Sequence, residues 1–426
     1  MEIKRDTYLN ELIKRQNNGM IKVVTGIRRS GKTYLLFDIF YKWLVSKGVK
    51  KDCIITLALD SIENERYRNP YELYDYIKEK IVDNKKQYYV LLDEIQYAIS
   101  KKELKDSENP PKLYEVLNSL LRKKNIDVYV TGSNSKLLSK DVMTEFRGRG
   151  DEVHIFPLSF KEFMSAYKGD VYHGWAEYSI YGGLPKVLSF IDKKDKMKYL
   201  NDLFKETYLL DILDRNDIDK TEELESIINL LASDIGSLTN PSKLEKTFKS
   251  KMHSSISHNT ISKYIDAMCD SFLVSEANRY DVKGKKYIST PSKYYFEDLG
   301  LRNARLNFRQ YDEPHVMENV IYNELRLRGY SVDVGIVEKR IKKDKVSSRV
   351  QYEIDFIANQ GNEKIYIQSA MSIANHQKQD QETKSLREIN DNFKKIVIVK
   401  DVIDKSVNED GIVYVNLFDF LLDSNE

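Results

Sequence analysis

Short apolar runs alternate with amphipathic stretches along the first 155 residues, and polar or turn-forming residues separate them. Runs of this length that are rich in Val, Ile, Leu and Tyr are typical of strands buried inside a parallel sheet. Stretches with an apolar residue at every third or fourth position predict helices that cover such a sheet. The alternation favours an α/β fold. The predicted strands are 21–25, 52–60, 87–96, 126–133 and 152–158, and helices are predicted at 34–44 and 71–81.

The first strand runs directly into a glycine-containing loop with the G-x-x-x-x-G-K-T spacing of a phosphate-binding loop. Its residues are Gly26-Ile27-Arg28-Arg29-Ser30-Gly31-Lys32-Thr33. Backbone N–H groups and the positive end of the following helix attract phosphates there. Lys32 supplies a point charge to the phosphates, and the Thr33 hydroxyl is an expected Mg²⁺ ligand. This loop and Tyr34 predict binding of ATP with Mg²⁺; a chance glycine turn between strand and helix is the alternative.

Two adjacent carboxylates end the third strand. Asp93 is expected to hold Mg²⁺, directly or through water, opposite Thr33, and Glu94 to orient and activate the attacking water. Two carboxylates are useful at this place because the metal neutralises one and leaves the other as a base. A solvated strand end is the alternative interpretation.

Polar and basic residues after the fourth strand add two further candidates. Asn134 follows that strand and can sense the γ-phosphate or the lytic water. The alternative role is a helix N-cap, and both roles can hold. Arg147 and Arg149 precede the fifth strand, where an oligomeric ATPase presents a charge to its neighbour's γ-phosphate. Solvated or phosphate-contacting arginines are the alternative.

The order of these motifs resembles AAA-type ATPases and, more closely, the prokaryotic archaeal-type AAA-like ATPase family, in which an AAA-like domain is fused to a C-terminal region of unknown function. The resemblance implies ATP binding and hydrolysis but no particular cellular task. The segments that carry it are 26–33, 91–96, 131–135, 146–149, 156–163 and Tyr181-Gly182-Gly183-Leu184-Pro185.

Beyond the fifth strand the chain predicts a helical region and then a winged helix. Helices at 160–167, 175–181, 184–191 and 196–212 form a candidate lid over the nucleotide. Three further helices (222–233, 244–248, 257–268) precede a basic hairpin, as in a winged helix. Duplex DNA is one expected ligand of this module, and a domain or subunit bridge is the alternative. The residues expected at bases are Asn259, Ser262 and Lys263, and those at phosphates are Lys283, Lys285 and Lys286.

The last 120 residues alternate a helix (316–327) with strands at 330–335, 351–358, 364–370, 395–399 and 412–416. This pattern resembles the restriction-endonuclease-like fold. Asp355 and Gln368 match acidic and polar positions of that fold, and Glu318 or Glu324 can be its helix acid. Ala370 stands where active members have lysine, so we expect a domain that is nuclease-like in shape and inactive.

Composition excludes some classes of protein. The 426 residues carry a formal net charge of +2, so the whole chain does not show the strong basic excess of many nucleic-acid-binding proteins. Cys53 and Cys269 lie apart in apolar runs and predict buried thiols rather than a disulfide or metal site. No apolar run approaches the roughly 18 residues of a membrane span. No signal peptide is visible either, and we expect a cytoplasmic protein without membrane contact.

These observations predict a P-loop ATPase domain (1–155), a helical lid (156–218), a winged-helix-like domain (219–300) and a nuclease-like α/β domain (301–426). The favoured function is an oligomerising, Mg²⁺-dependent ATPase that couples hydrolysis to action on nucleic acid or a protein partner. The alternatives are an ATP-gated scaffold with slow hydrolysis and an ATP-controlled, Mg²⁺-dependent nuclease.

Overall fold

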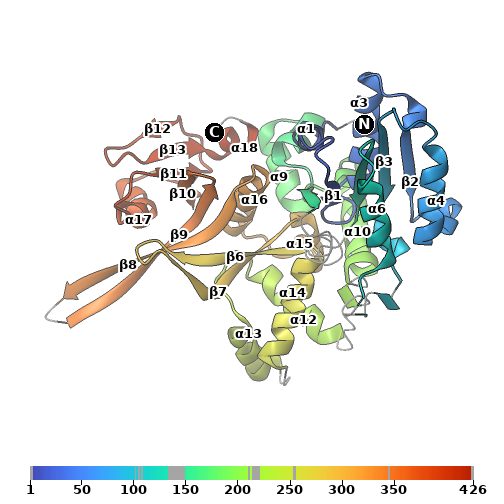
Figure 1. The fold of residues 1–426 in the computed structure, drawn as a ribbon. Coiled ribbons are helices and arrows are strands. Elements are labelled where there is room, and N and C mark those ends of the chain that lie inside the picture. The colour runs from blue at the N-terminus through green and yellow to red at the C-terminus, as the bar shows by residue number, and fades with distance from the viewer. Residues whose placement is uncertain are drawn as a thin grey trace. The chain divides into compact units, whose positions relative to one another are not determined.

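The computed structural model describes residues 3–100, 102–103, 106, 109–132, 149–209, 212–213, 221–252, 256–343 and 346–423. The chain divides into two compact units, each built around a sheet of its own (Figure 1). The first unit comprises Met1–Pro157 with Asp270–Phe272, and the second comprises Leu158–Cys269 with Leu273–Glu426. Within the described residues, none of the helices has both the length and the apolar character needed to cross a bilayer.

The sheet of the first unit is parallel, with the described strand order β2-β3-β4-β1-β5. Every residue of β1, β3 and β4 is buried, whereas the two edge strands β2 and β5 are only partly buried. This burial explains the continuous apolar runs of the sequence and confirms the predicted strands. The bounds are β1 Ile21–Thr25, β2 Ile54–Ala58, β3 Tyr88–Asp93, β4 Ile126–Thr131 and β5 Gly150–His154.

Amphipathic helices cover this sheet. In α6, Leu113, Leu117 and Leu120 lie on one face and join the hydrophobic core of the unit. Pro70 starts α4 behind an Asn69 side chain that accepts the Tyr71 N–H, which fixes the start of that helix. The helices are α1 Asp6–Lys14, α2 Lys32–Tyr34, α3 Tyr41–Ser46, α4 Pro70–Lys80 and α6 Lys112–Leu121, and a π-helical turn at Leu35–Phe40 joins α2 to α3.

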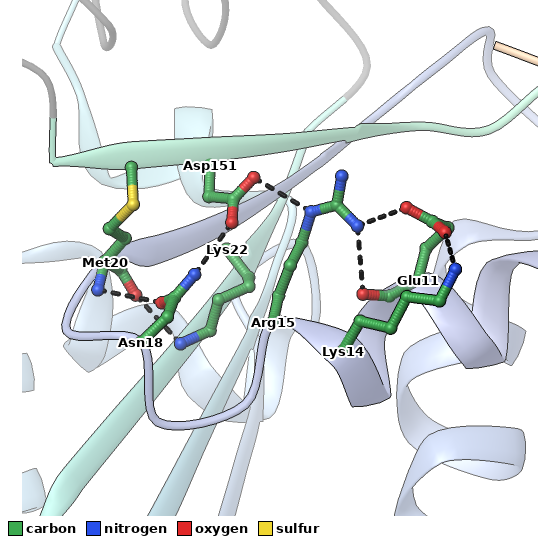
Figure 2. Close-up of polar contacts among 7 residues, drawn as sticks. All are labelled: Glu11, Lys14, Arg15, Asn18, Met20, Lys22 and Asp151. Carbon is green, nitrogen blue, oxygen red and sulfur yellow. Dashed lines mark hydrogen bonds and ion pairs between the residues drawn. The ribbon is translucent and has the colours of Figure 1, made fainter.

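A polar network ties α1 to the amino ends of β1 and β5 (Figure 2). The Arg15 guanidinium donates to Asp151 at 2.9 Å, and the Asn18 side-chain amide donates to the other oxygen of Asp151 at 2.8 Å. The buried Lys22 ammonium donates to the Met20 carbonyl at 2.8 Å. It also pairs with Asp127. These contacts lie at the opposite end of β1 from the phosphate-binding loop and serve the fold.

The second unit begins with helices. Ser159 and Glu162 form a reciprocal capping box at the start of α8. The predicted helix at 184–191 is instead a short 3₁₀ turn, Pro185–Ser189, closed by i→i+3 bonds such as Val187 N–H to Leu184 C=O at 3.0 Å. The helices are α8 Phe160–Ala166, α9 Val171–Tyr181, α10 Lys193–Leu203, α12 Thr221–Ser233, α13 Pro241–Thr247, α14 His258–Asp270, α15 Leu299–Arg305, α16 Glu313–Leu327, α17 His376–Arg387 and α18 Leu417–Leu422; π-helical turns follow α10 and α13 at Phe204–Leu209 and Phe248–Met252.

A mixed sheet organises the rest of the second unit, with the described strand order β12-β13-β11-β10-β9-β8-β6-β7. The predicted basic hairpin is present as β6 and β7, and β6 also pairs with β8. The hairpin therefore belongs to the same sheet as the C-terminal strands, while the boundary at residue 300 and the winged-helix assignment stay predictions. The strands are β6 Val274–Asp281, β7 Lys286–Phe296, β8 Ser331–Lys343, β9 Val346–Gln360, β10 Glu363–Ala370, β11 Lys394–Val399, β12 Ser406–Val407 and β13 Val413–Asn416.

Two strands are much longer than the sequence predicts. The pattern indicates strands at 330–335 and 351–358, but β8 and β9 continue as a paired ribbon through Lys343 and Val346. The prediction was too short because charged residues interrupt the apolar residues in the segment between the two predicted strands.

Candidate functional site

The strand order of the first unit places the carboxyl ends of β3, β4 and β1 side by side. In open parallel sheets ligands bind beyond these ends. The phosphate-binding loop follows β1, and the acidic pair Asp93-Glu94 stands at the end of β3. The sheet therefore brings these two predicted halves of the site together.

The backbone of the phosphate-binding loop requires its glycines. Gly26 has a φ of +134°, and a Cβ built on it would lie 2.2 Å from the carbonyl oxygen of Ile155, just beyond β5. Gly31 immediately precedes α2 with a φ of +100°. Both glycines thus hold conformations that a side chain would oppose.

Lys32 is enclosed by the loop. Its ammonium donates to the carbonyl oxygens of Gly26 at 2.9 Å and Ile27 at 3.1 Å, and the side chain is buried. The Ser30 hydroxyl is also buried and has no hydrogen-bond partner among the described residues. A polar group of this kind is unsatisfied unless a ligand or water pairs with it. The loop therefore combines a buried cation with unused hydrogen-bonding capacity, as a phosphate site requires.

Asp93 connects the loop to the neighbouring strand. The Thr33 hydroxyl donates to one carboxylate oxygen of Asp93 at 2.7 Å, and the Thr131 hydroxyl donates to the other. Burial raises the pKa of Asp93 above its usual value, against the lowering effect of the two hydroxyl groups. Hydroxyl and carboxylate oxygens are hard ligands that suit Mg²⁺. The donors present therefore fit the implied metal, with Thr33 and Asp93 as the residues that would hold it.

Glu94 occupies a strained position. Its φ is +53°, in the left-handed region, and its N–H donates to the Thr131 hydroxyl at 3.0 Å. The Gln96 side-chain amide donates to the Glu94 carboxylate. Such strain persists where the surrounding structure holds it, often at functional positions. Thr131 thus holds the Glu94 backbone, and Gln96 directs a carboxylate on a residue that is partly open to solvent.

Sequence reasoning missed Thr131 and Gln96 as parts of this site. Thr131 ends β4 and contacts both acidic residues, which depends on β4 lying next to β3. The available signal was its place at the polar end of a buried strand. Gln96 follows the acidic pair by two residues, and that spacing could have identified it as a partner of Glu94.

The other predicted residues of the nucleotide site stand as follows. Arg29 has a φ of +66°, and the Ile27 side chain is buried in the core. Asn134 and Arg147 lie outside the described residues. The Arg149 carbonyl accepts the Ile21 N–H at 2.8 Å, which places this residue at the amino end of β1, at the opposite sheet edge from Lys32. Arg149 thus does not join the phosphate site of its own chain.

A second polar cluster lies in the second unit. The Lys293 ammonium on β7 lies 2.8 Å from a carboxylate oxygen of Glu318 on α16 and 2.8 Å from one of Glu353 on β9. The Tyr295 hydroxyl donates to Glu318 at 2.5 Å. Burial raises the pKa of Glu318 to about 7, although Lys293 acts in the opposite direction. The cluster is therefore an ion-pair network with the buried Lys293 ammonium at its centre.

The other residues that the sequence predicts for a nuclease-like domain stand as follows. Asp355 accepts the Ser369 N–H at 2.8 Å and the Ser369 hydroxyl at 2.7 Å. Glu324 instead pairs with Arg328 at 2.8 Å, so Glu318 is the helix acid that faces the cluster. The Ala370 side chain is buried at the end of β10. Within the described ranges, His, Cys, Asp and Glu side chains do not form a group of three or more with metal-binding geometry.

Two family models match successive parts of the chain. Residues 18–164 match the family model of an AAA domain, and residues 172–312 match a model described as a domain of unknown function. An uncharacterized protein of Haemophilus influenzae is 35% identical over 99% of this chain and 98% of its own length. An uncharacterized protein of Methanocaldococcus jannaschii is 30% identical over 79% of this chain and 71% of its own length.

Among solved structures, the Walker-type ATPase PABY2304 of Pyrococcus abyssi has the same fold. The match has a TM-score of 0.50 at 15% identity, and it covers 72% of this chain and 96% of that protein. Together these matches establish the family resemblance that the sequence predicts. They comprise an AAA domain, the domain that follows it and a fold shared with a Walker-type ATPase. The chain belongs to the prokaryotic archaeal-type AAA-like ATPase family.

Proposed function

We propose that the chain binds ATP with Mg²⁺ and hydrolyses it at the carboxyl ends of β1, β3 and β4. The observation that carries the proposal is the 2.7 Å hydrogen bond between the Thr33 hydroxyl and Asp93. It joins the phosphate-binding loop to the acidic strand end, and so places both expected metal-holding side chains at one point. The buried Lys32 ammonium in the same loop supplies positive charge for the phosphates.

Each residue has a distinct task in this proposal. Lys32 exchanges its bonds with the Gly26 and Ile27 carbonyls for bonds with phosphate oxygens. Thr33 and Asp93 hold Mg²⁺, which neutralises phosphate charge when bound. Glu94, whose backbone is held by Thr131 and whose carboxylate is held by Gln96, accepts a proton from the attacking water.

Two substitutions separate binding from hydrolysis. Lys32→Ala should abolish binding of a fluorescent ATP analogue, because it removes the only lysine of the loop. Glu94→Gln should keep that binding and lower phosphate release by about 100-fold or more, a usual effect of removing a general base. Phosphate release by Glu94→Gln at the unmodified rate would refute the role given to Glu94.

A matched control comes from the exposed surface of the same unit. Glu65→Gln removes an exposed carboxylate of the same unit and should leave both binding and phosphate release unchanged. If this control lost activity as well, the loss in Glu94→Gln would not report on catalysis.

We further propose that hydrolysis requires a neighbouring subunit and drives the second unit against a partner. Arg147 and Arg149 are the candidates for the charge supplied to a neighbour, and the position of Arg149 away from its own phosphate site is compatible with that role. Duplex DNA and a protein remain the candidate partners of the winged-helix-like part, in which Asn259 and Lys263 are exposed. An ATP-gated scaffold with slow hydrolysis is the alternative function.

We propose that the nuclease-like part does not cleave nucleic acid. The Lys293 ammonium already neutralises Glu318 and Glu353, and it is buried between them. Ala370 offers no cation at the position that active members of the fold use. Both observations favour a binding or structural role for this part of the chain.

A further inference from the structure

Aromatic and basic side chains meet on one face of the second sheet, although they come from segments far apart in the sequence (Figure 1). Tyr280 of β6 pairs with Tyr287 of β7, and their ring centroids lie 5.3 Å apart at an interplanar angle of 70°. The Lys364 ammonium of β10 lies 5.8 Å from the centroid of the Tyr280 ring. It also lies 5.1 Å from the ring centroid of Phe393, which precedes β11. We call these four side chains the aromatic row.

The sheet leaves room for the aromatic row. Strand β8 lies between β6 and β9, and its residue in register with Tyr280 is Gly335. Glycine has no side chain that would separate the Tyr280 ring from Lys364, and a Cβ on it would lie 2.9 Å from the Cβ of Ile354. Helix α17 packs on β9, β10 and β11, and Tyr280 packs against the hydrophobic core beneath that helix. The row therefore extends from the covered part of this face to its open part.

The two ends of the aromatic row are open to solvent. Tyr287 is 63% exposed and Phe393 is 42% exposed, although both carry large apolar rings. Tyr280 is partly buried and meets the Tyr287 ring edge-on. The Tyr287 hydroxyl donates to the buried Asp333 at 3.1 Å, which fixes the direction of the ring. Exposed rings that the fold holds in place offer flat apolar surfaces on which a planar ligand can stack.

The surroundings of the aromatic row are basic. Residues 279–287 contain four basic side chains and one acidic side chain, a net charge of +3, whereas the complete chain has +2. Lys285 and Lys286 of the β6–β7 turn are exposed, and so is Lys394 next to Phe393. Positive charge therefore lies at both ends of the row, where it attracts an anionic ligand.

Acidic side chains of the same segments are engaged in contacts within the fold. A carboxylate that pairs with a lysine or accepts a hydrogen bond repels an approaching anion less than a free carboxylate does. The exposed lysines therefore dominate the charge that a ligand meets. The contacts are those of Asp281 with the Gly284 N–H at 2.9 Å, Asp391 with the Tyr366 hydroxyl at 2.6 Å, and Glu388 with Lys283 and Lys339.

We propose that the aromatic row binds single-stranded nucleic acid, with bases stacked on Tyr287 and Phe393 and phosphates beside Lys285 and Lys286. Every base has a flat π-face, so exposed rings beside lysines bind single strands with little preference for sequence. A duplex hides these faces between its stacked base pairs, and polyglutamate has none. The proposal goes beyond the proposed function, in which the partner is duplex DNA or a protein, and the binding itself needs no ATP.

The test is fluorescence anisotropy of labelled oligothymidylate and oligouridylate, each of about 16 nucleotides, with the full chain and without ATP. Tyr287→Leu and Phe393→Leu should each lower the affinity for both strands by about fivefold or more, because a stacked base is lost. The slope of log affinity against log salt should not change, since stacking releases no counterions. Lys285→Gln/Lys286→Gln should instead lower that slope by about 0.7 for each lost phosphate contact.

Two further variants separate stacking from misfolding. Tyr287→Phe keeps the ring and loses only the bond to Asp333, so it should keep most of the affinity. Tyr172→Leu is the matched control elsewhere in the second unit, because Tyr172 is 55% exposed and also meets one ring, that of Phe418, edge-on. This control should bind as tightly as the unmodified chain. Equal losses in Tyr172→Leu and Tyr287→Leu, or no loss in Tyr287→Leu, would overturn the proposal.

A DNA duplex and polyglutamate are the competing ligands. We expect the duplex to bind about tenfold or more weakly than the single strand, since its bases are stacked on one another. Duplex binding as tight as that of the single strand, or polyglutamate binding that depends on Tyr287, would overturn the proposal. Because the titrations contain no ATP, a chain that binds single strands through the aromatic row but does not hydrolyse ATP would refute only the hydrolysis proposal. A chain that hydrolyses ATP but does not bind single strands would refute only the binding proposal.

Discussion

Gly26 shows how a single residue position depends on a distant strand end. Its φ is +134°, and a Cβ added to it would meet the Ile155 carbonyl oxygen at 2.2 Å, which leaves no room for a side chain. The spacing of the loop motif predicts a glycine there but does not identify the obstacle. Ile155 follows β5 and approaches Gly26 because β5 pairs with β1.

Gly26→Ala should therefore damage the nucleotide site. We expect the free energy of unfolding to fall by about 2–4 kcal/mol, since both strain and a backbone clash are introduced. Binding of a fluorescent ATP analogue should weaken by about tenfold or more because the loop must move. Chemical denaturation and a nucleotide titration measure the two effects.

Gly19→Ala is the matched control for this substitution. Gly19 also has a positive φ, +74°, but open space surrounds the position of its Cβ. Its replacement should cost only about 1 kcal/mol and leave ATP binding unchanged. Equal effects of the two substitutions would show that the clash with Ile155 is unimportant.

At the scale of elements, Lys293 joins β7, α16 and β9 through its two carboxylate partners. The buried Glu318 carboxyl has its pKa raised from 4.5 to about 7. The native state thus binds this proton more tightly than the unfolded chain. The contribution of Glu318 to stability consequently falls as pH rises from about 4.5 to about 7.

Lys293→Met should make that pH dependence steeper. Methionine has a similar length but no charge, so the Glu318 carboxylate would be buried without its cation. We expect the free energy of unfolding to fall by about 3–5 kcal/mol at pH 8, where Glu318 is ionised. The loss should be much smaller at pH 5, where Glu318 is protonated, and urea denaturation at both pH values measures it.

Adding Glu318→Gln to this variant is the control. An amide cannot ionise between pH 5 and pH 8, so the double variant should lose the extra pH dependence and recover part of the stability at pH 8. A loss in Lys293→Met that is equal at both pH values would contradict the role given to the ion pair.

At the scale of the whole molecule, the proposed arginine contact between copies of the chain concerns residues that lie apart in the first unit. Lys32, Thr33, Asp93 and Glu94 lie at the carboxyl ends of the strands, whereas Arg149 lies at the amino end of β1. In the proposed function, Arg149 therefore acts on the γ-phosphate of another copy rather than on that of its own chain. Hydrolysis by this family member is therefore expected to depend on assembly.

Mixing two inactive variants tests that expectation. Glu94→Gln retains the arginines, and Arg147→Ala/Arg149→Ala retains Glu94. In a mixed assembly the arginines of the first complete the site of the second, so phosphate release should recover to a measurable fraction of the normal rate.

The control mixture combines Glu94→Gln with Lys32→Ala. Neither of these chains has a complete set of residues within its own site, so no recovery is expected although both keep the arginines. Failure of the first mixture to recover, with proven exchange of subunits, would assign the arginines another role.

Much of the fold and part of the site could be predicted from the sequence. The buried strands of the first unit and the positions of Lys32, Thr33, Asp93 and Glu94 depend on local patterns, namely apolar runs and a loop of fixed spacing. The length of β8 and β9 could not be predicted, because charged residues interrupt the apolar pattern between the two predicted strands. Lys293 was also missed, since its acidic partners are 25 and 60 residues away.

Local sequence is enough to identify the phosphate-binding loop and the acidic end of β3, because conformational demands on glycine and the polarity of strand ends act over a few residues. Tertiary structure alone decided that β4 lies between β3 and β1 and brings Thr131 to Asp93 and Glu94. It also decided that Lys293 lies between two carboxylates and that β8 and β9 continue as a paired ribbon. These features arise from pairing and packing between distant segments, which a local pattern does not encode.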